Sequence, residues 1–69
     1  MPEGTVLWFN DISGTGAIVA DLDGSIVKVA HKSIVGQGYK ILDEGQRVSF
    51  VALKRKAGLE ACSVIPLEC

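Results

Sequence analysis

Five short runs rich in β-branched and aromatic residues, separated by Gly, Asp, Asn or Lys clusters, make up most of this 69-residue chain. Runs of this length and composition, bounded by turn residues, are typical of β-strands. They predict strands at about residues 4–10, 15–20, 25–31, 46–54 and 59–65. The pattern therefore indicates an all-β fold.

The segments between the runs contain residues suited to turns. Asp23-Gly24 is the strongest two-residue hairpin signal in the chain, because glycine adopts the positive φ that such turns require. Pro66 ends the last run, since proline cannot donate a hydrogen bond to a neighbouring strand. The longer connection, residues 32–45, is expected to fold back onto the core with one helical turn near residues 32–34.

Short strands in so small a chain indicate a closed barrel. A two-layer sheet of this size would leave edges that it could not cover, whereas closure removes those edges. Alternation along each strand places every second side chain inside. The residues expected in the core, with Ile34 closing one end, are Val6, Ile18, Val27, Val29, Val48, Phe50 and Val64.

The composition fits a single folded domain over residues 1–69. Hydrophobic residues make up 48% and charged residues 22% of the chain, as in globular domains and unlike disordered segments. The formal net charge is −1, so no overall positive field indicates a nucleic-acid partner. Binding also depends on where the Lys and Arg side chains lie, so this evidence against such a partner is weak.

Several classes of protein are not expected. Cys62 and Cys69 are too few for a disulfide framework, which favours a reduced, cytoplasmic protein. Together with His31 they lack the spacing of a metal site, and no cofactor motif is present. We expect no signal peptide and no membrane span. No Ser-His-Asp or Cys-His arrangement indicates catalysis, so we do not expect an enzyme.

The single Trp of the chain, Trp8, stands beside Phe9 at the end of the first predicted strand. Two adjacent large aromatic residues at a strand end are either core anchors or an exposed platform for flat ligands. The local sequence alone favours the core. The choice between the two interpretations therefore depends on the rest of the chain.

Three segments resemble the bacterial cold-shock proteins, which are small five-stranded OB-fold barrels. Residues 4–10 (GTVLWFN) are similar to their first strand, residues 36–50 to their long loop and fourth strand, and residues 61–67 to their closing strand. The resemblance covers essentially the whole chain, with at most one inserted residue near Leu22. It implies an antiparallel OB-fold barrel that binds single-stranded DNA or RNA on a sheet surface built from two ribonucleoprotein-type motifs.

Both of those motifs are altered in this chain. The first is normally Lys-Gly-Phe-Gly-Phe-Ile, whereas residues 13–18 are Ser-Gly-Thr-Gly-Ala-Ile. The second is normally Val-Phe-Val-His-Phe, whereas residues 27–31 are Val-Lys-Val-Ala-His. A one-residue shift that kept the histidine would turn the valines outward, so we reject it. The inward residues are thus retained and the outward, ligand-facing residues are changed.

The resemblance implies a single-stranded nucleic-acid-binding module with a weakened or altered surface. On this hypothesis the binding residues are Trp8, Phe9, Lys28, His31, Tyr39 and Arg55. Each also has a simpler structural explanation. The aromatic pair would belong to the core, the histidine to the surface, the tyrosine to the mouth of the barrel, and residues 54–56 to a solvated turn.

The alternative hypothesis is a barrel that has lost nucleic-acid binding and binds a protein or a second copy of itself. Its basis is an apolar set at outward positions, where the family carries aromatic, charged or polar groups. These residues are Leu7, Ala17, Val19, Ile26 and Ala30. An exposed apolar patch on a small protein usually marks a contact surface. This hypothesis predicts a homodimer through the outer face of the sheet.

Overall fold

The computed structural model describes residues 2–36 and 41–67. Its strands are β1 (Glu3–Asn10), β2 (Thr15–Ala20), β3 (Ile26–Ala30), β4 (Arg47–Arg55) and β5 (Gly58–Pro66). A short 3₁₀ helix, η1 (His31–Ser33), follows β3. Every predicted strand is confirmed, with its boundaries correct to within one residue, and the helical turn begins one residue earlier than expected.

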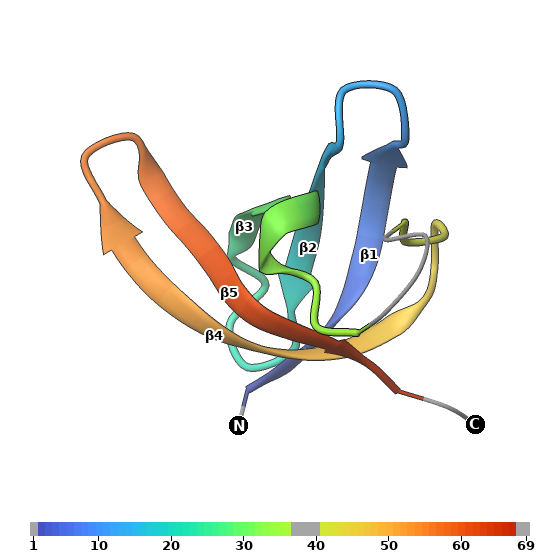
Figure 1. The fold of residues 1–69 in the computed structure, drawn as a ribbon. Helices are drawn as coiled ribbons and strands as arrows, with labels where there is room; N and C mark the ends of the chain where they lie inside the picture. Colours follow the sequence, from blue (N-terminus) through green and yellow to red (C-terminus); the bar gives the residue numbers. More distant parts are fainter. Residues whose placement is uncertain (1, 37–40, 68–69) are drawn as a thin grey trace.

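The strands close into a barrel in the order β1-β2-β3-β5-β4 (Figure 1). Neighbouring strands are antiparallel except β3 and β5, which pair in parallel at Lys28 and Glu60. A ring with an odd number of strands cannot alternate direction all the way round, so one parallel pair is unavoidable. The expected closed barrel is confirmed, with this one exception to its antiparallel arrangement.

The barrel interior is filled by inward side chains from all five strands. Phe50 and Ile18 are fully buried and are the largest of these side chains. The residues predicted for the core are all buried, including Ile34, and Leu42 and Ala61 join them. Because packing depends on these inward residues, the outward ones can change without loss of the fold.

The β4–β5 hairpin projects beyond the barrel (Figure 1). A register shift between Ser49 and Val51 interrupts the pairing of β4 with β5. From Val51 to the end of β4 every residue is exposed. The outer half of β4 is therefore accessible on both faces.

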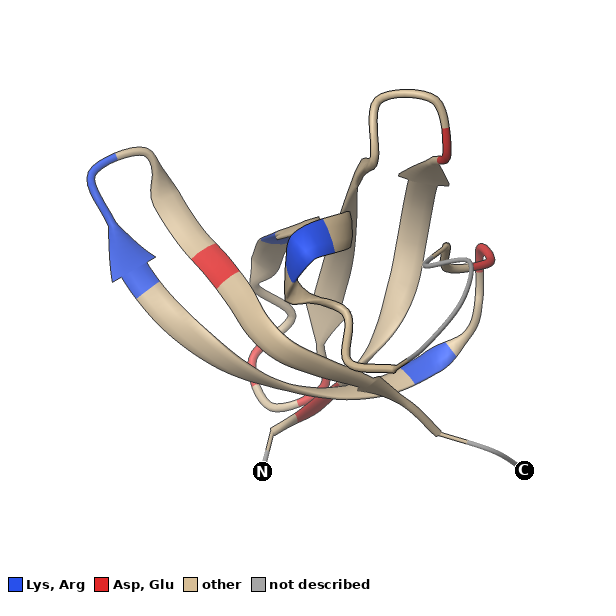
Figure 2. Cartoon of the chain, in the orientation of Figure 1, with Lys and Arg blue, Asp and Glu red and all other residues tan. Residues whose placement is uncertain are grey.

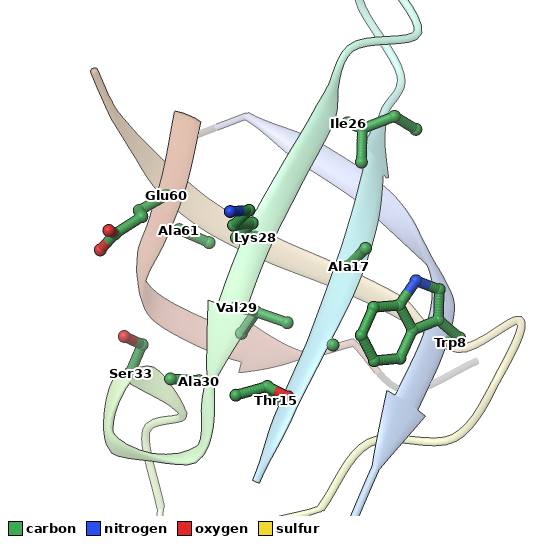
Figure 3. A pocket seen from close by; sticks show the side chains of 11 residues that line it. Trp8, Thr15, Ala17, Ile26, Lys28, Val29, Ala30, Ser33, Glu60 and Ala61 are labelled. Atoms are coloured by element: carbon green, nitrogen blue, oxygen red, sulfur yellow. The ribbon is translucent and has the colours of Figure 1, made fainter. Parts of the chain in front are cut away.

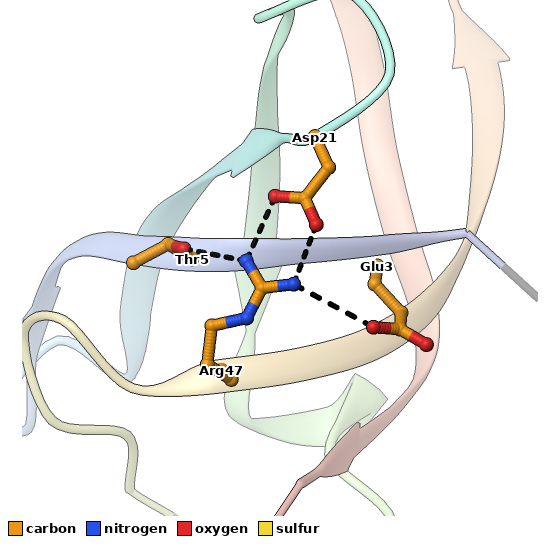
Figure 4. A network of polar contacts seen from close by, with 4 residues as sticks. All are labelled: Glu3, Thr5, Asp21 and Arg47. Carbon is orange, nitrogen blue, oxygen red and sulfur yellow. Dashed lines mark hydrogen bonds and ion pairs between the residues drawn. The ribbon is translucent and has the colours of Figure 1, made fainter.

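Arg47 on β4 ties together β1 and the β2–β3 turn (Figure 4). Its guanidinium donates two hydrogen bonds to the Asp21 carboxylate, one of them 2.8 Å long, and a third of 2.9 Å to the Thr5 hydroxyl. The Glu3 carboxylate lies 3.5 Å away. The hydrogen bond from Arg47 lowers the pKa of Asp21 below its ordinary value of 3.8.

We predict that Arg47→Met lowers the free energy of unfolding more at neutral pH than in acid. The pair stabilises the folded wild type because the fold favours the ionised form of Asp21. This contribution to the free energy of unfolding is complete above the ordinary pKa of 3.8 and is lost as the pH falls through the lowered pKa. Denaturant unfolding of both proteins near neutral pH and well below the pKa of Asp21 checks this. An equal difference under both conditions would contradict the role given to the Arg47–Asp21 pair.

Candidate nucleic-acid interface

A hollow of about 520 Å³ lies on the outer surface of the barrel (Figure 3). Trp8 from β1 and Glu60 from β5 stand at its two sides, and β2 and β3 cross its floor. Small side chains such as Ala17 and Ala30 leave the space open between the larger groups. Two of the predicted binding residues, Trp8 and Lys28, line this hollow.

Strand pairing places four of the lining residues side by side across the sheet. Trp8 pairs with Ala17 on β2, and Ala17 pairs with Lys28 on β3. Lys28 in turn pairs with Glu60 on β5. Neighbouring strands lie about 4.8 Å apart, so this Trp8–Glu60 row crosses three strand spacings. An indole, a methyl group, an ammonium and a carboxylate follow one another along it.

Trp8 faces outward because β1 contains a bulge. Val6 pairs with Ile18 and Trp8 pairs with Ala17, which leaves Leu7 as an extra residue on β1. Both Leu7 and Trp8 are 46% exposed as a result. Phe9 is only partly exposed and packs against the core. The structure thus separates the aromatic pair, with Trp8 at the hollow and Phe9 against the barrel interior.

Gly16 allows β2 to lie close to this end of β1. A Cβ atom at this position would be 2.5 Å from the carbonyl oxygen of Trp8 and 2.7 Å from the ring of Phe9. The first of these is a backbone atom within a paired strand, so it cannot move away without disturbing the sheet. Position 16 therefore requires glycine, because β2 lies against Trp8 and Phe9 there.

His31 lies outside the lining of the hollow but is tied to the turn before β2. Its backbone N–H donates a 2.7 Å hydrogen bond to the carbonyl oxygen of Gly14. Its ring covers the same glycine, where a Cβ atom would be 2.4 Å from the His31 Nδ1. Tyr39, another predicted binding residue, lies outside the described residues.

Basic residues gather at the tip of the β4–β5 hairpin and at η1 (Figure 2). The hairpin carries Lys54, Arg55 and Lys56, and η1 carries Lys32, all of them exposed. The Arg55 Nε is 3.8 Å from a carboxylate oxygen of Glu60, and the two side chains are 55% and 51% exposed. Exposed ion pairs of this kind stabilise a protein little. The net charge of −1 therefore conceals a locally basic region.

Comparison with known proteins agrees with this architecture. Residues 2–67 match the family model described as the 'Cold-shock' DNA-binding domain. The chain is a member of the cold-shock domain family. The resemblance that its strands and loops suggested is therefore confirmed.

Individual cold-shock relatives match nearly the whole chain. The cold shock-like protein CspA of Vibrio cholerae is 48% identical over 64 residues, which cover 93% of this chain and 91% of that protein. The major cold shock protein CspA of Pseudomonas aeruginosa is 48% identical over 61 residues, covering 88% and 87%. The cold shock protein CspB of Bacillus caldolyticus is 42% identical over 67 residues, covering 97% and 100%.

The family and the structure also test the expectations about enzyme activity, membrane spans and metal sites. The family is described as a DNA-binding domain, in agreement with the prediction that this cold-shock domain is not an enzyme. Across residues 2–36 and 41–67, no helix has the length and apolar character needed to cross a membrane. In the same part of the chain, no three His, Cys, Asp or Glu side chains gather as metal ligands would. The cytoplasmic location stays a prediction.

Glu60 is the charged lining residue of the hollow that the sequence did not indicate. It reaches the hollow through the parallel pairing of β3 with β5, which joins strands far apart in the chain. The local sequence around it contains only an isolated acidic residue in a predicted strand. The strand order of the family's barrel could have predicted its position, because that order places β5 beside β3.

We predict that Gly16→Ala destabilises this cold-shock domain by about 1–3 kcal/mol, as overpacking of a tight contact usually does. Thr15→Ala is the matched control, because it lies on the same strand with an exposed side chain. Denaturant unfolding followed by Trp8 fluorescence measures both variants. Equal stability of Gly16→Ala and the wild type would show that β1 and β2 do not require this close approach.

Proposed function

We propose that this cold-shock domain binds single-stranded DNA or RNA across the hollow, with fewer stacking contacts than the family motifs provide. The observation that carries the proposal is the exposed Trp8 at the side of the hollow, in one row with Lys28. Aromatic stacking and basic groups along the backbone are the two components of single-strand binding. Exposed basic residues at η1 and at the β4–β5 hairpin support the same conclusion.

Five of the six predicted residues have a defined part in this proposal. Trp8 stacks on a base, and Lys28 contacts a phosphate near the middle of the row. Arg55 reaches the sugar–phosphate backbone of the ligand from the β4–β5 hairpin, and His31 contacts the ligand from the start of η1. Phe9 anchors the end of β1 in the core and so holds Trp8 in place. A contribution of Tyr39 stays a prediction, since this residue lies outside the described part of the chain.

Binding is expected to be weaker than the complete motifs would give. Thr15, Ala17 and Lys28 stand where the family motifs have phenylalanine. Stacking contributes roughly 1–3 kcal/mol per base, so the loss of three rings removes several kcal/mol. At about 1.4 kcal/mol per tenfold change, this corresponds to a few decades in affinity. Lys28 replaces part of the loss with an electrostatic contact.

The alternative function, a contact surface for a protein or a second copy, is less well supported by the structure. Of the five outward apolar residues on which it rests, Leu7 and Ile26 are 46% and 53% exposed. The expected exposure of Ala17 is wrong: this residue is only 3% exposed, because its small side chain lies on the floor of the hollow. Val19 and Ala30 are partly covered. Only two of the five residues are therefore exposed, which favours the nucleic-acid ligand.

We predict that pyrimidine-rich oligonucleotides quench the fluorescence of Trp8. Because the chain contains a single Trp, the signal reports this site alone. The logarithm of the affinity should fall with the logarithm of the salt concentration by about 0.7 for each phosphate contacted. Lys28→Ala should reduce this slope by the contribution of one contact. Absence of quenching at low salt and high micromolar oligonucleotide would overturn the proposal.

A further inference from the structure

We infer that His31 binds a phosphate of the single strand through Nε2, so that binding strengthens as this side chain becomes protonated in mildly acidic solution. This inference rests on the proposed function and adds regulation by pH to it. The observation behind it is an exposed imidazole that is held beside the hollow with its Nε2 edge turned away from the β1–β2 turn (residues 11–14). His31 is the single histidine of the chain.

His31 stands at the end of the hollow where β3 passes into η1. Ala30, directly before it, and Ser33, two positions after it, both line the hollow. Thr15, which pairs with Ala30, lines the same end (Figure 3). Gly14, the residue before Thr15, lies directly against the ring. A ligand that occupies this end of the hollow therefore comes within reach of His31.

Contact with Gly14 fixes the orientation of the imidazole. The backbone N–H of His31 donates its 2.7 Å hydrogen bond to the carbonyl oxygen of this glycine. A Cβ atom on Gly14 would lie 2.4 Å from Nδ1 and 3.2 Å from each of Cε1 and Cγ. Nδ1 and its two ring neighbours therefore face the glycine, and the opposite edge, which contains Nε2, faces away. Because the residue is exposed, Nε2 is accessible to a ligand.

The imidazole has no partner of its own among residues 2–36 and 41–67. No hydrogen bond or ion pair in this part of the chain involves the ring. The elements around it carry two positive and two negative residues, which are Lys28 on β3, Lys32 on η1, Asp11 in the β1–β2 turn and Glu60 on β5. Protonation of His31 therefore adds a positive charge to an otherwise balanced set.

Protonation changes both the charge and the hydrogen bonding of an imidazole. Its charge ordinarily changes between about pH 5 and 8, whereas carboxylates ordinarily titrate near pH 4 and lysines above about pH 10. The neutral ring donates from only one of its two nitrogens, and the protonated ring donates from both. Protonation thus ensures a donor on Nε2. Charge-assisted hydrogen bonds to phosphate are also stronger than neutral ones, so affinity should rise as the pH falls.

The test measures the affinity for oligo(dT) by quenching of Trp8 fluorescence at about pH 5.5 and about pH 7.5, over a range of salt concentrations. At about 50 mM salt the wild type should bind roughly three- to tenfold more tightly at the lower pH, which is the value of one further phosphate contact. The decrease of the logarithm of affinity with the logarithm of salt concentration should also be steeper there, by up to about 0.7.

His31→Gln and His31→Arg are the matched variants. Glutamine is polar and uncharged at both pH values, whereas arginine is charged at both. Each variant should therefore show the same affinity and the same salt dependence at the two pH values. His31→Gln should resemble the wild type at the higher pH, and His31→Arg should resemble it at the lower pH. Denaturant unfolding establishes that both variants are folded.

Three results would overturn the inference while the proposed function stands. The first is a wild type whose affinity for oligo(dT) is the same at both pH values. The second is a pH dependence that persists in His31→Gln, because another group would then cause it. The third is tighter binding at the lower pH without a steeper salt dependence, because the added contact would then not be with phosphate. If the wild type binds no oligo(dT) at either pH and low salt, the proposed function fails and the inference fails with it.

Discussion

The pairing of β3 with β5 turns a set of hairpins into a barrel. β1, β2 and β3 form one continuous antiparallel sheet, and the hairpin of β4 and β5 is joined to it by the pairing of β1 with β4. The parallel contact between Lys28 and Glu60, extended by the bridge between Ile34 and Val64, closes the ring between them. The same contact supplies the β5 wall of the hollow. The closed core and the candidate ligand surface therefore both depend on the pairing of β3 with β5.

The dependence on pairing between strands explains which features could be predicted from the sequence and which could not. The inward residues follow the period of two within each strand, so Val6, Ile18 and Phe50 were placed in the core correctly. The exposure of Ala17 was predicted wrongly, because it depends on the depth of the hollow around this small side chain. The bulge at Leu7 and the arrival of Glu60 beside Lys28 depend on contacts between strands. Local patterns carry no information about such contacts.

The candidate surface combines a retained scaffold with a changed chemistry. The bulge in β1 and the glycine at position 16 keep Trp8 in place, while Thr15 and Ala17 replace rings with smaller side chains. Lys28 adds a positive charge in the middle of the sheet, whereas Ser13 stands where the first family motif has lysine. Binding on such a surface is expected to depend on salt and to involve fewer stacked bases than the complete motifs allow.

If the fold is retained while the stacking surface is reduced, restoring one ring should tighten binding. Thr15 is exposed and lines the hollow, which makes it a suitable position for this change. Thr15→Phe should increase the affinity for a single-stranded oligonucleotide by the value of one stacked base, roughly 5- to 150-fold. Thr15→Leu, which adds apolar bulk without a ring, should leave the affinity near that of the wild type. A folded Thr15→Phe variant that binds no more tightly than the wild type would contradict this account.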